Sequence, residues 1–572
     1  MSFPAMSVAQ AHALLCAPGA PFEMDTITIR DLPTRVYKNQ PPTLRQIFQL
    51  ARTHGDIDFL VYEDERISYR AFCNAAARLS HVLVDRFGVK KGDRVAFAIR
   101  NLPEWPVVFY ASILAGAMVV PLNAWWTVDE LTYGFDDSGS VLAFLDGERA
   151  ARMGAAASTL KTVRATITVR DTTGAVPGAI ALEELIGPAT SWADLPHIEE
   201  VDAGLEPDDL ATLFYTSGTT GAPKGAYGTH RNCLTNLMNA MVNTARMFLR
   251  RGEMPPAPDP DAPKKAFLLG IPFFHVTGCH SVLIPAIAQG WKIVMMRKWD
   301  AGLGLKLIER EKITHFGGVP AIAWQVLEHP DLATTDTSSV ESVSYGGAPS
   351  AAELVRQIVA TFPKVQPGQG YGLTETSAAV TNIGGEDYQL RPLSCGPIAP
   401  VNDARVVGPD GQDVPDGDVG ELWVRGSNVI CGYWNKPEAT EAAFGGGWFK
   451  TGDLVKRDEE GFIFIVDRAK DMIIRGGENV YCVEVEDVLY QHPDISDAAI
   501  IGVPHKVLGE EVGAVVTVSP DSTVEEADVK AWVAARLASF KVPAHVRILR
   551  EPLLRNANGK ILKRDLKALF EA

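Results

Sequence analysis

The sequence has few cysteines, a deficit of basic residues and no basic N-terminal region, and each shortage argues against a class of protein. Its seven cysteines are scattered over 572 residues without a CxxC pair, so neither a zinc site nor a disulfide framework is indicated. Asp and Glu outnumber Lys and Arg by 70 to 54, and the net charge of −16 argues against nucleic acid or anionic lipid as general partners. A secretory signal begins with a basic region, but no lysine or arginine precedes Arg30. We expect a cytoplasmic protein.

Long uncharged runs are scarce as well. Residues 105–122 are uncharged and long enough to suggest a membrane span, but they contain Pro106, Gly116 and Pro121. This pattern favours a buried helix that leads into a buried strand. We expect no integral membrane segment.

The chain is too long for one hydrophobic core, and its pattern changes along its length. Residues 1–40 show little periodicity and suggest an N-terminal arm, whereas from Thr43 onward helical spacing alternates with short β-rich runs. Such alternation predicts the α/β class, with parallel sheets covered by helices. The proline-rich residues 252–265 predict an exposed loop.

A second β-rich region spans residues 401–466, and the chain then becomes a compact α+β unit that ends in a basic stretch at 560–567. We therefore expect two domains, 1–466 and 467–572.

One loop has the composition of a phosphate-binding segment. It follows the apolar run 210–214, which predicts a buried strand, and combines hydroxyl groups, glycines and a lysine: Thr216, Ser217, Gly218, Thr219, Thr220 and Lys224. Glycines let backbone N–H groups approach an anion, and the hydroxyls and the lysine add donors and charge. Gly225 follows Lys224, so this is not a Walker loop. A polar surface turn is the alternative.

Further short motifs carry groups suited to chemistry. The run 271–275 predicts an apolar strand that ends at His275, and 344–349 predicts a tight turn. The remaining candidates are Gly346, Gly347 and Ala348 in that turn, Gln369, Gly370, Tyr371, Thr374 and Glu375, then Asp453, Arg468 and Lys470, and Lys560 after an Asn-Gly pair.

In this order and spacing, these motifs resemble the adenylate-forming superfamily of acyl-CoA synthetases, adenylation domains and luciferases, from about Thr43 to Leu569. The resemblance implies a large N-terminal domain of parallel-sheet lobes with a small β-barrel-like lobe, and a small mobile α+β C-terminal domain. It also implies a two-step reaction with ATP, Mg²⁺ and CoA, in which an acid first becomes acyl-AMP and a thiol then displaces AMP.

The resemblance gives each nucleotide-site residue an expected role. The loop from Thr216 to Lys224 would hold the β- and γ-phosphates, Tyr371 would stack on adenine and Thr374 would donate to the α-phosphate. Glu375 is the expected Mg²⁺ ligand, because this cation prefers carboxylate oxygen; a helix N-terminal carboxylate is the alternative. Asp453 would accept from the ribose hydroxyls, reinforced by Arg468.

Other roles concern the moving domain and the acid. Lys560 would stabilise charge in the adenylation transition state, Lys470 would be the hinge, and Gly476 and Gly477 would let the pantetheine arm of CoA pass. Surface charge is the alternative for both lysines. His275 would be a gate beside the acyl pocket or, alternatively, a core residue.

We expect an acyl-CoA synthetase for a hydrophobic carboxylic acid, fatty or aryl. Its apolar pocket would draw on Phe273, Phe274, Val319, Trp324, Tyr345 and Ala348. An amino-acid adenylation domain would need an aspartate near Phe274 to pair with the substrate ammonium. An acyl-AMP ligase that loads a carrier protein, a luciferase-like oxygenase and a non-catalytic nucleotide-binding relative stay open.

The sequence leaves several points undecided. Lys298 and Arg475 are the candidates for the CoA phosphates. The acid and the oligomeric state are open, with a homodimer as one option and peripheral membrane association as another if the acid is long-chain.

Overall fold

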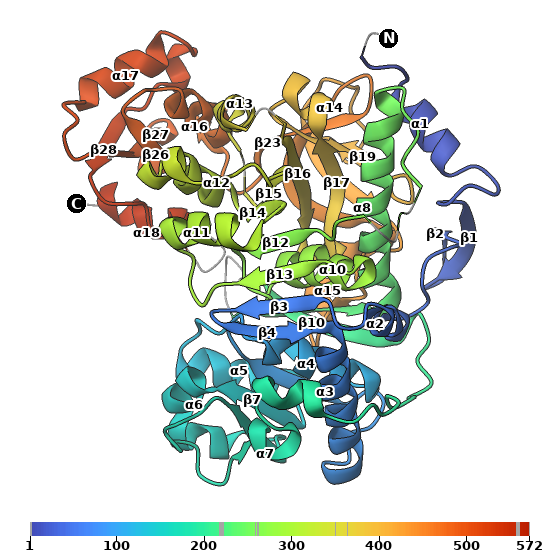
Figure 1. The fold of residues 1–572 in the computed structure, drawn as a ribbon. Helices are drawn as coiled ribbons and strands as arrows, with labels where there is room; N and C mark the ends of the chain where they lie inside the picture. Colours follow the sequence, from blue (N-terminus) through green and yellow to red (C-terminus); the bar gives the residue numbers. More distant parts are fainter. Residues whose placement is uncertain are drawn as a thin grey trace.

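The computed structural model describes residues 3–216, 222–257, 259, 262–348, 350–362, 364–555 and 561–570. Two eight-stranded sheets form most of its body (Figure 1). In spatial order, the first sheet contains β21 (Gly432–Tyr433), β11 (Lys224–Thr229), β10 (Leu210–Thr216), β6 (Met118–Pro121), β5 (Arg94–Ala98), β7 (Leu142–Asp146), β8 (Ala165–Val169) and β9 (Ile180–Ala181).

The second sheet has the same number of strands and lies above the first in Figure 1. Its order is β17 (Ala378–Gly384), β16 (Gln366–Leu373), β15 (Ser342–Gly346), β14 (His315–Gly318), β12 (Ala266–Leu269), β13 (Lys292–Met295), β3 (Asp58–Tyr62) and β4 (Glu65–Ser68). The neighbours from β16 through β3 run parallel, as do β6, β5, β7, β8 and β9, so the predicted α/β class with parallel-sheet lobes is confirmed.

Helices connect and cover these strands. The largest apolar core includes residues of both sheets and of α3 and α4, among them Phe59, Phe97 and Trp105. The helices of this part are α2 (Leu44–Thr53), α3 (Tyr69–His81), α4 (Glu104–Leu114), α5 (Val128–Ser138), α6 (Gly147–Met153), α7 (Leu182–Ile186), α8 (His230–Arg250), α9 (Val276–Gly278), α10 (Ile284–Gln289), α11 (Ala301–Glu311), α12 (Pro320–Leu327), α13 (Ala352–Thr361) and α14 (Gly385–Leu390).

The long helix α8 runs beside β17 and forms one side of the candidate site (Figure 1). The Asn236 side chain accepts from the backbone N–H of Ala379 at 2.9 Å, and Arg246 donates to the carbonyl of Asn382 at 2.6 Å. These two bonds, nearly three helical turns apart, hold the helix along the strand.

The uncharged run 105–122 forms helix α4 and the buried strand β6, as its pattern indicates. The helix begins at Glu104, after Pro103. The nearby Asn101 side chain donates to the carbonyl of Ile271 at 3.0 Å and accepts from the N–H of Phe273 at 2.9 Å. None of the helices among the described residues is long and apolar enough to cross a membrane.

The N-terminal arm is more ordered than its sequence indicates. It forms a helix that packs on α8 and a two-stranded hairpin: α1 (Val8–Leu15), β1 (Met24–Ile29) and β2 (Leu32–Tyr37). At the hairpin turn, Arg30 donates to the carbonyls of Ile430 at 2.5 Å and Val429 at 2.9 Å. The arm is therefore fastened to the segment that leads into β21.

The predicted β-rich region forms a five-stranded antiparallel sheet. Its order is β18 (Ser394–Pro397), β23 (Phe462–Arg468), β22 (Phe449–Arg457), β20 (Gly420–Arg425) and β19 (Asp403–Val407), with α15 (Pro437–Phe444) beside it. The chain leaves this sheet after Arg468.

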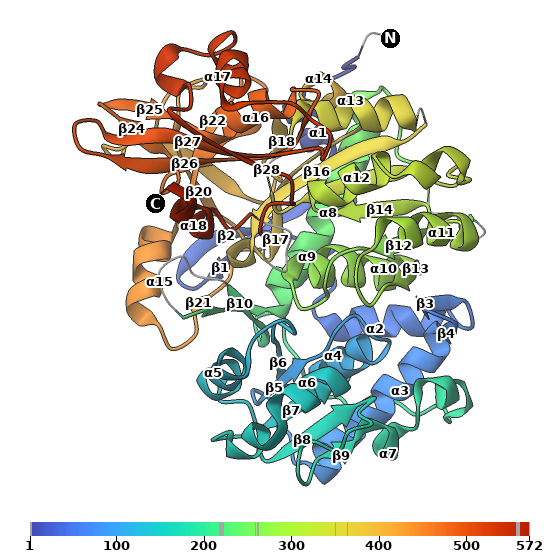
Figure 2. The ribbon, with the colours of Figure 1, turned by 90° about the vertical axis from the view of Figure 1, so that its left-hand side faces the viewer.

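The C-terminal unit begins with β24 and lies at the far end of the molecule from the first sheet (Figure 2). It contains β24 (Ile473–Arg475), β25 (Glu478–Val480), α16 (Cys482–Tyr490), β26 (Ile495–His505), β27 (Gly509–Val518), α17 (Glu526–Ala534), β28 (His545–Leu549) and α18 (Lys563–Leu566). Its own apolar core includes Ile473, Val485 and Val529. The predicted compact α+β unit is present.

Candidate active site

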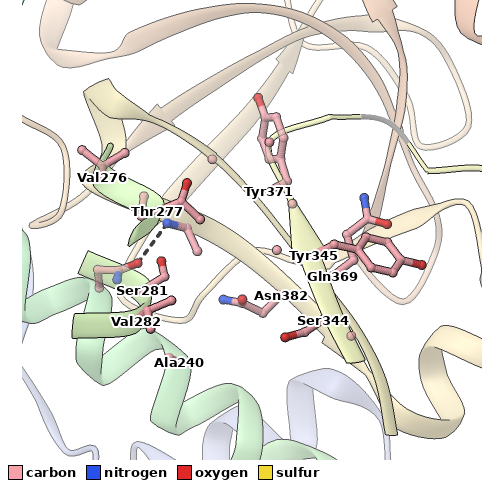
Figure 3. A pocket seen from close by; sticks show the side chains of 18 of the residues that line it. Ala240, Val276, Thr277, Ser281, Val282, Ser344, Tyr345, Gln369, Tyr371 and Asn382 are labelled. Atoms are coloured by element: carbon pink, nitrogen blue, oxygen red, sulfur yellow. Dashed lines mark hydrogen bonds between the residues drawn. The ribbon is translucent and has the colours of Figure 1, made fainter. Parts of the chain in front are cut away.

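A cavity of about 1820 Å³ opens between α8, strands β15 to β17 and the end of β23 (Figure 3). Its lining includes residues from both eight-stranded sheets and from the antiparallel sheet. The site is therefore built where separate parts of the fold meet, as ligand sites of α/β proteins often are.

The two ends of the predicted phosphate loop line this cavity. β10 ends at Thr216 and β11 begins at Lys224, and these two residues are paired across the hairpin and line the cavity. The Lys224 ammonium lies 5.0 Å from the centroid of the Tyr433 ring, a cation–π contact. Ser217, Gly218, Thr219 and Thr220 lie outside the described residues.

Glu375 is a buried carboxylate next to this lysine. It lies in a three-residue 3-10 helix, Thr374–Thr376, directly after β16, and accepts from the Tyr433 hydroxyl at 2.7 Å. Burial raises the pKa of Glu375, while the bond from Tyr433 and the charges of Arg468 and Lys224 act in the opposite direction. The alternative for Glu375 is a carboxylate stabilised by the dipole at a helix N-terminus. A helix of one turn has almost no dipole, so this alternative has little support.

A chain of three polar side chains lies on the same wall. The Tyr371 hydroxyl donates to Asp453 at 2.7 Å, and the guanidinium of Arg468 is paired with the other oxygen of Asp453 at 2.7 Å. Asp453 and Arg468 are opposite each other on β22 and β23. Tyr371 and Arg468 line the cavity, and the buried Asp453 lies behind them, so this carboxylate fixes the orientation of both.

The donor set fits Mg²⁺ bound together with a nucleotide. Among the described residues no group of three or more His, Cys, Asp and Glu side chains could hold an ion by itself. Mg²⁺ is commonly held by one or two carboxylates together with substrate phosphates and water, and Glu375 offers one buried carboxylate beside the end of the phosphate loop.

His275 differs from its predicted setting. Strand β12 ends at Leu269, and His275 is the N-cap residue of α9 rather than the end of a strand. Gly270 precedes the run 271–275, Pro272 interrupts it, and Asn101 binds its backbone. His275 lines the cavity, its Nε2 is buried without a hydrogen-bond partner among the described residues, and burial lowers the pKa of the imidazole to about 3. The imidazole is therefore neutral at physiological pH.

The other predicted residues divide into three groups. Some line the cavity: Gly346, Gly347, Gln369, Gly370, Thr374 and Lys470. A second group is described but is not in that lining: Ala348, and Gly476 and Gly477 in the turn between β24 and β25. Lys560 lies outside the described residues.

The structure revises the predicted acyl pocket. Of its six residues, Val319 and Tyr345 line the cavity, whereas Phe273 lies in the core against Trp105 at a centroid distance of 5.1 Å. Phe274, Trp324 and Ala348 are likewise not in the lining. The apolar wall comes instead from α8 and from residues 276–285, including Leu237, Ala240, Val276, Val282 and Pro285. The tight turn predicted at 344–349 begins later, because Ser344 to Gly346 belong to β15.

Sequence reasoning missed Tyr433, whose hydroxyl binds Glu375 although the two residues are 58 positions apart. Its location follows from the pairing of β21 with β11, which no local pattern indicates. The candidate CoA-binding Arg475 is paired with Glu511 at 3.5 Å.

One wall of the cavity carries a lysine, a buried carboxylate and an oriented tyrosine, and the neighbouring wall is apolar. This combination is typical of an α/β enzyme with a nucleotide site. Comparison with known proteins agrees. The model of the AMP-binding enzyme family matches residues 47–434, and that of the AMP-binding enzyme C-terminal domain matches residues 484–560. The chain therefore belongs to the family of AMP-binding enzymes.

Its relatives include enzymes named for two kinds of acid. The feruloyl-CoA synthase of Amycolatopsis sp is 34% identical over 505 residues, covering 88% of this chain and 94% of that protein. The long-chain-fatty-acid–CoA ligase FadD13 of Mycobacterium tuberculosis is 33% identical over 509 residues, covering 89% of this chain and 94% of that protein.

Solved structures of related enzymes share the fold. ATP-bound MatB from Rhodopseudomonas palustris is 30% identical with a TM-score of 0.77, covering 92% of this chain and 99% of that one. The o-succinylbenzoate CoA synthetase MenE of Bacillus subtilis, solved with its acyl-adenylate OSB-AMP, is 28% identical with a TM-score of 0.74, covering 92% and 98%.

Proposed function

We propose that this protein is an AMP-forming acid–CoA ligase that acts on a hydrophobic carboxylic acid. The acid attacks the α-phosphorus of ATP, releasing pyrophosphate and forming acyl-AMP, and the thiol of CoA then attacks the acyl carbonyl and releases AMP. Belonging to the AMP-binding enzymes supports the first step, and relatives named CoA synthetases and CoA ligases support the second.

The observation that carries this proposal is the convergence of Lys224, Glu375 and Tyr371 on one cavity wall. In the proposed site, Lys224 and the loop before it hold the β- and γ-phosphates, Thr374 donates to the α-phosphate and Tyr371 stacks on adenine. Asp453, which lies behind Tyr371 and Arg468 and is bound to both, would accept from the ribose hydroxyls with its remaining lone pairs.

Glu375 would hold Mg²⁺ through its buried carboxylate, and the ion would neutralise phosphate charge. Tyr433 has a positioning role here, because its hydroxyl fixes one carboxylate oxygen and its ring lies beneath Lys224. The Tyr433 side chain thus sets the spacing between the Lys224 ammonium and the Glu375 carboxylate.

We also propose that the chain works as two domains, 1–466 and 467–572, with Lys470 as hinge. The chain leaves β23 after Arg468 and enters the C-terminal sheet at Ile473, so the candidate hinge lies in the connection between the two sheets. Rotation there would bring Lys560 to the acid for adenylation, and Gly476 and Gly477 to the pantetheine arm for thioester formation.

The cavity favours a hydrophobic acid over an amino acid. An amino-acid substrate needs a carboxylate to pair with its ammonium group, and no aspartate is among the described residues that line the cavity. Three of the described glutamates line it: we assign Glu375 to Mg²⁺, Glu341 is paired with Lys265, and Glu130 accepts from the backbone N–H of Thr127.

Acid-dependent exchange of labelled pyrophosphate into ATP tests the first step, and release of AMP that requires CoA tests the second. We expect exchange with at least one hydrophobic acid in the absence of CoA, and thioester in its presence. Exchange that is followed by transfer only to a carrier protein would favour the acyl-AMP ligase alternative, and no exchange with any acid would refute the proposal.

A further inference from the structure

The wall of the cavity formed by the second sheet presents a floor that is nearly free of side chains. Two rows of cross-strand neighbours lie on this face. Ser344, Gly368 and Gly384 form one row, and Gly346, Gly370 and Asn382 form the other, each with one residue from β15, β16 and β17. Directly paired residues share a face of a sheet, and all six line the cavity. We call these six residues the glycine floor.

The four glycines leave space that any other residue would fill. A Cβ atom at Gly384 would lie 3.0 Å from the sulfur of Met247 on α8, and one at Gly370 would lie 3.1 Å from Oδ1 of Asn382. Both distances are shorter than ordinary van der Waals contact, so side chains there would push aside the Met247 side chain or the Asn382 amide. The absent side chains therefore create the gap between sheet and helix.

The two side chains that do project from the floor are polar. Figure 3 shows Ser344 and Asn382 directed into the cavity, towards Ala240 and Val282 on the opposite wall. Neither side chain has a hydrogen-bond partner among the described residues. By contrast, the hydroxyl of Tyr345, the residue between Ser344 and Gly346 on β15, is bonded to the hydroxyl of Tyr388 at 2.9 Å. An amide and a hydroxyl thus face the cavity without a hydrogen-bond partner among the described residues, opposite a wall that holds Ala240 and Val282 together with Thr277 and Ser281.

This arrangement penalises a purely hydrocarbon ligand. An alkyl chain in the cavity would displace water from the amide and the hydroxyl and offer no hydrogen bond in return, which is unfavourable for each group. Asn382 can donate and accept, and so can Ser344, so a hydroxyl, ether or carbonyl oxygen satisfies either.

We propose that the acid carries an oxygen function partway along its skeleton, and that Asn382 and Ser344 recognise it by hydrogen bonding. The proposal rests on the function proposed above and narrows its substrate class from hydrophobic acids in general to oxygenated ones. The row of Asn382 is nearer to Tyr371, and the row of Ser344 lies about 7 Å deeper along the strands. Asn382 would therefore meet the part of the acid closer to its carboxylate.

The experiment compares matched acids in acid-dependent pyrophosphate exchange with the full-length protein. One pair is aromatic, cinnamate against 4-hydroxy-3-methoxycinnamate, and one is aliphatic, hexadecanoate against hydroxyhexadecanoates. In at least one pair we expect kcat/KM for the oxygenated acid to exceed that for the plain acid by about 5- to 100-fold. Asn382→Leu keeps the shape of the side chain without its hydrogen bonds, and should bring that ratio close to one. Ser344→Ala tests the deeper group in the same way.

Thr244→Val is the matched control. Thr244 also lines the cavity, but its hydroxyl already donates to the carbonyl of Ala240 at 3.2 Å within α8, so its loss should leave the ratio unchanged. Thermal unfolding with and without ATP verifies that each variant folds.

A preference for the oxygenated acid that Asn382→Leu or Ser344→Ala abolishes, and Thr244→Val does not, supports the inference. Plain acids used as well as their oxygenated partners, or a preference that survives both variants, would overturn it and leave the ligase function intact. The absence of exchange with every acid would refute that function, and the inference with it.

Discussion

Replacing Tyr433 by Phe removes one atom from the candidate site and isolates one interaction. The hydroxyl donates to Oε1 of Glu375 at 2.7 Å, and both groups are buried. The ring stays, so the contact of 5.0 Å with the Lys224 ammonium is retained. Any effect should therefore arise from the carboxylate.

The magnitude follows from the charge of the acceptor. A hydrogen bond to a charged group contributes about 1.5 to 3 kcal/mol. Since about 1.4 kcal/mol corresponds to a tenfold change in rate, Tyr433→Phe should lower kcat/KM for pyrophosphate exchange by about 10- to 150-fold. Because Tyr433 positions Glu375, rather than binding the acid, the loss should be the same for different acids.

The pH profile gives a second measurement. Burial raises the pKa of Glu375 and the Tyr433 bond opposes that rise, so removing the bond raises this pKa further. The active form is the ionised carboxylate, which is lost as the pH falls through its pKa. The acidic limb of the pH–rate profile should therefore move to higher pH in Tyr433→Phe, and added Mg²⁺ should partly reverse the shift.

Tyr227→Phe is the control for this substitution. Tyr227 lies on the neighbouring strand β11, is not in the described lining of the cavity, and its hydroxyl has no partner among the described residues. An unchanged kcat/KM and an unchanged acidic limb in Tyr433→Phe, or equal effects of the two substitutions, would refute the reasoning.

Three further predictions concern other parts of the chain. Lys560→Ala should block acyl-AMP formation yet still convert supplied acyl-AMP and CoA to thioester, and equal loss of both half-reactions would contradict a moving C-terminal domain. Arg250→Met should lower the free energy of unfolding in urea by about 3 to 5 kcal/mol, because it leaves the buried Asp387 without the guanidinium 2.6 Å away; a loss below about 1 kcal/mol would argue against this account. The pKa of about 3 for His275 lies below its unfolded value of 6.5, so this residue contributes stability above pH 6.5 that is lost as the pH falls towards 3. Urea unfolding of His275→Phe should accordingly show a weaker pH dependence in this window, and equal slopes would count against the buried neutral imidazole.

Local patterns predicted the helix and strand of 105–122 and the strand at 210–214, but not the contacts between elements. The run 210–214 became β10 because a continuous apolar stretch of strand length is a local property. The run 271–275 did not form a strand, because Gly270 precedes it, Pro272 interrupts it, and Asn101, 170 positions away from Ile271, binds its backbone. Tertiary hydrogen bonds of this kind leave no local trace in the sequence.

The candidate site shows the same limit. The short motifs indicated Lys224, Glu375 and Tyr371, because charged and aromatic groups next to glycine are conspicuous. The partner of Glu375 is supplied by β21, whose pairing with β11 is a property of the sheet. The alternating glycines of β16 are visible in the sequence, yet only the register with β15 and β17 shows which face they share with Asn382.

The hairpin turn of the N-terminal arm also bears on catalysis. Arg30 donates to the carbonyls of Val429 and Ile430, four and three residues before Tyr433. Deleting the first 42 residues would therefore remove the hydrogen bonds that hold the segment before Tyr433, the residue that orients Glu375. The deletion would remove no residue of the proposed nucleotide site. Such a shortened protein should resemble Tyr433→Phe in its acidic limb, which would make the arm a remote support of the metal-binding carboxylate.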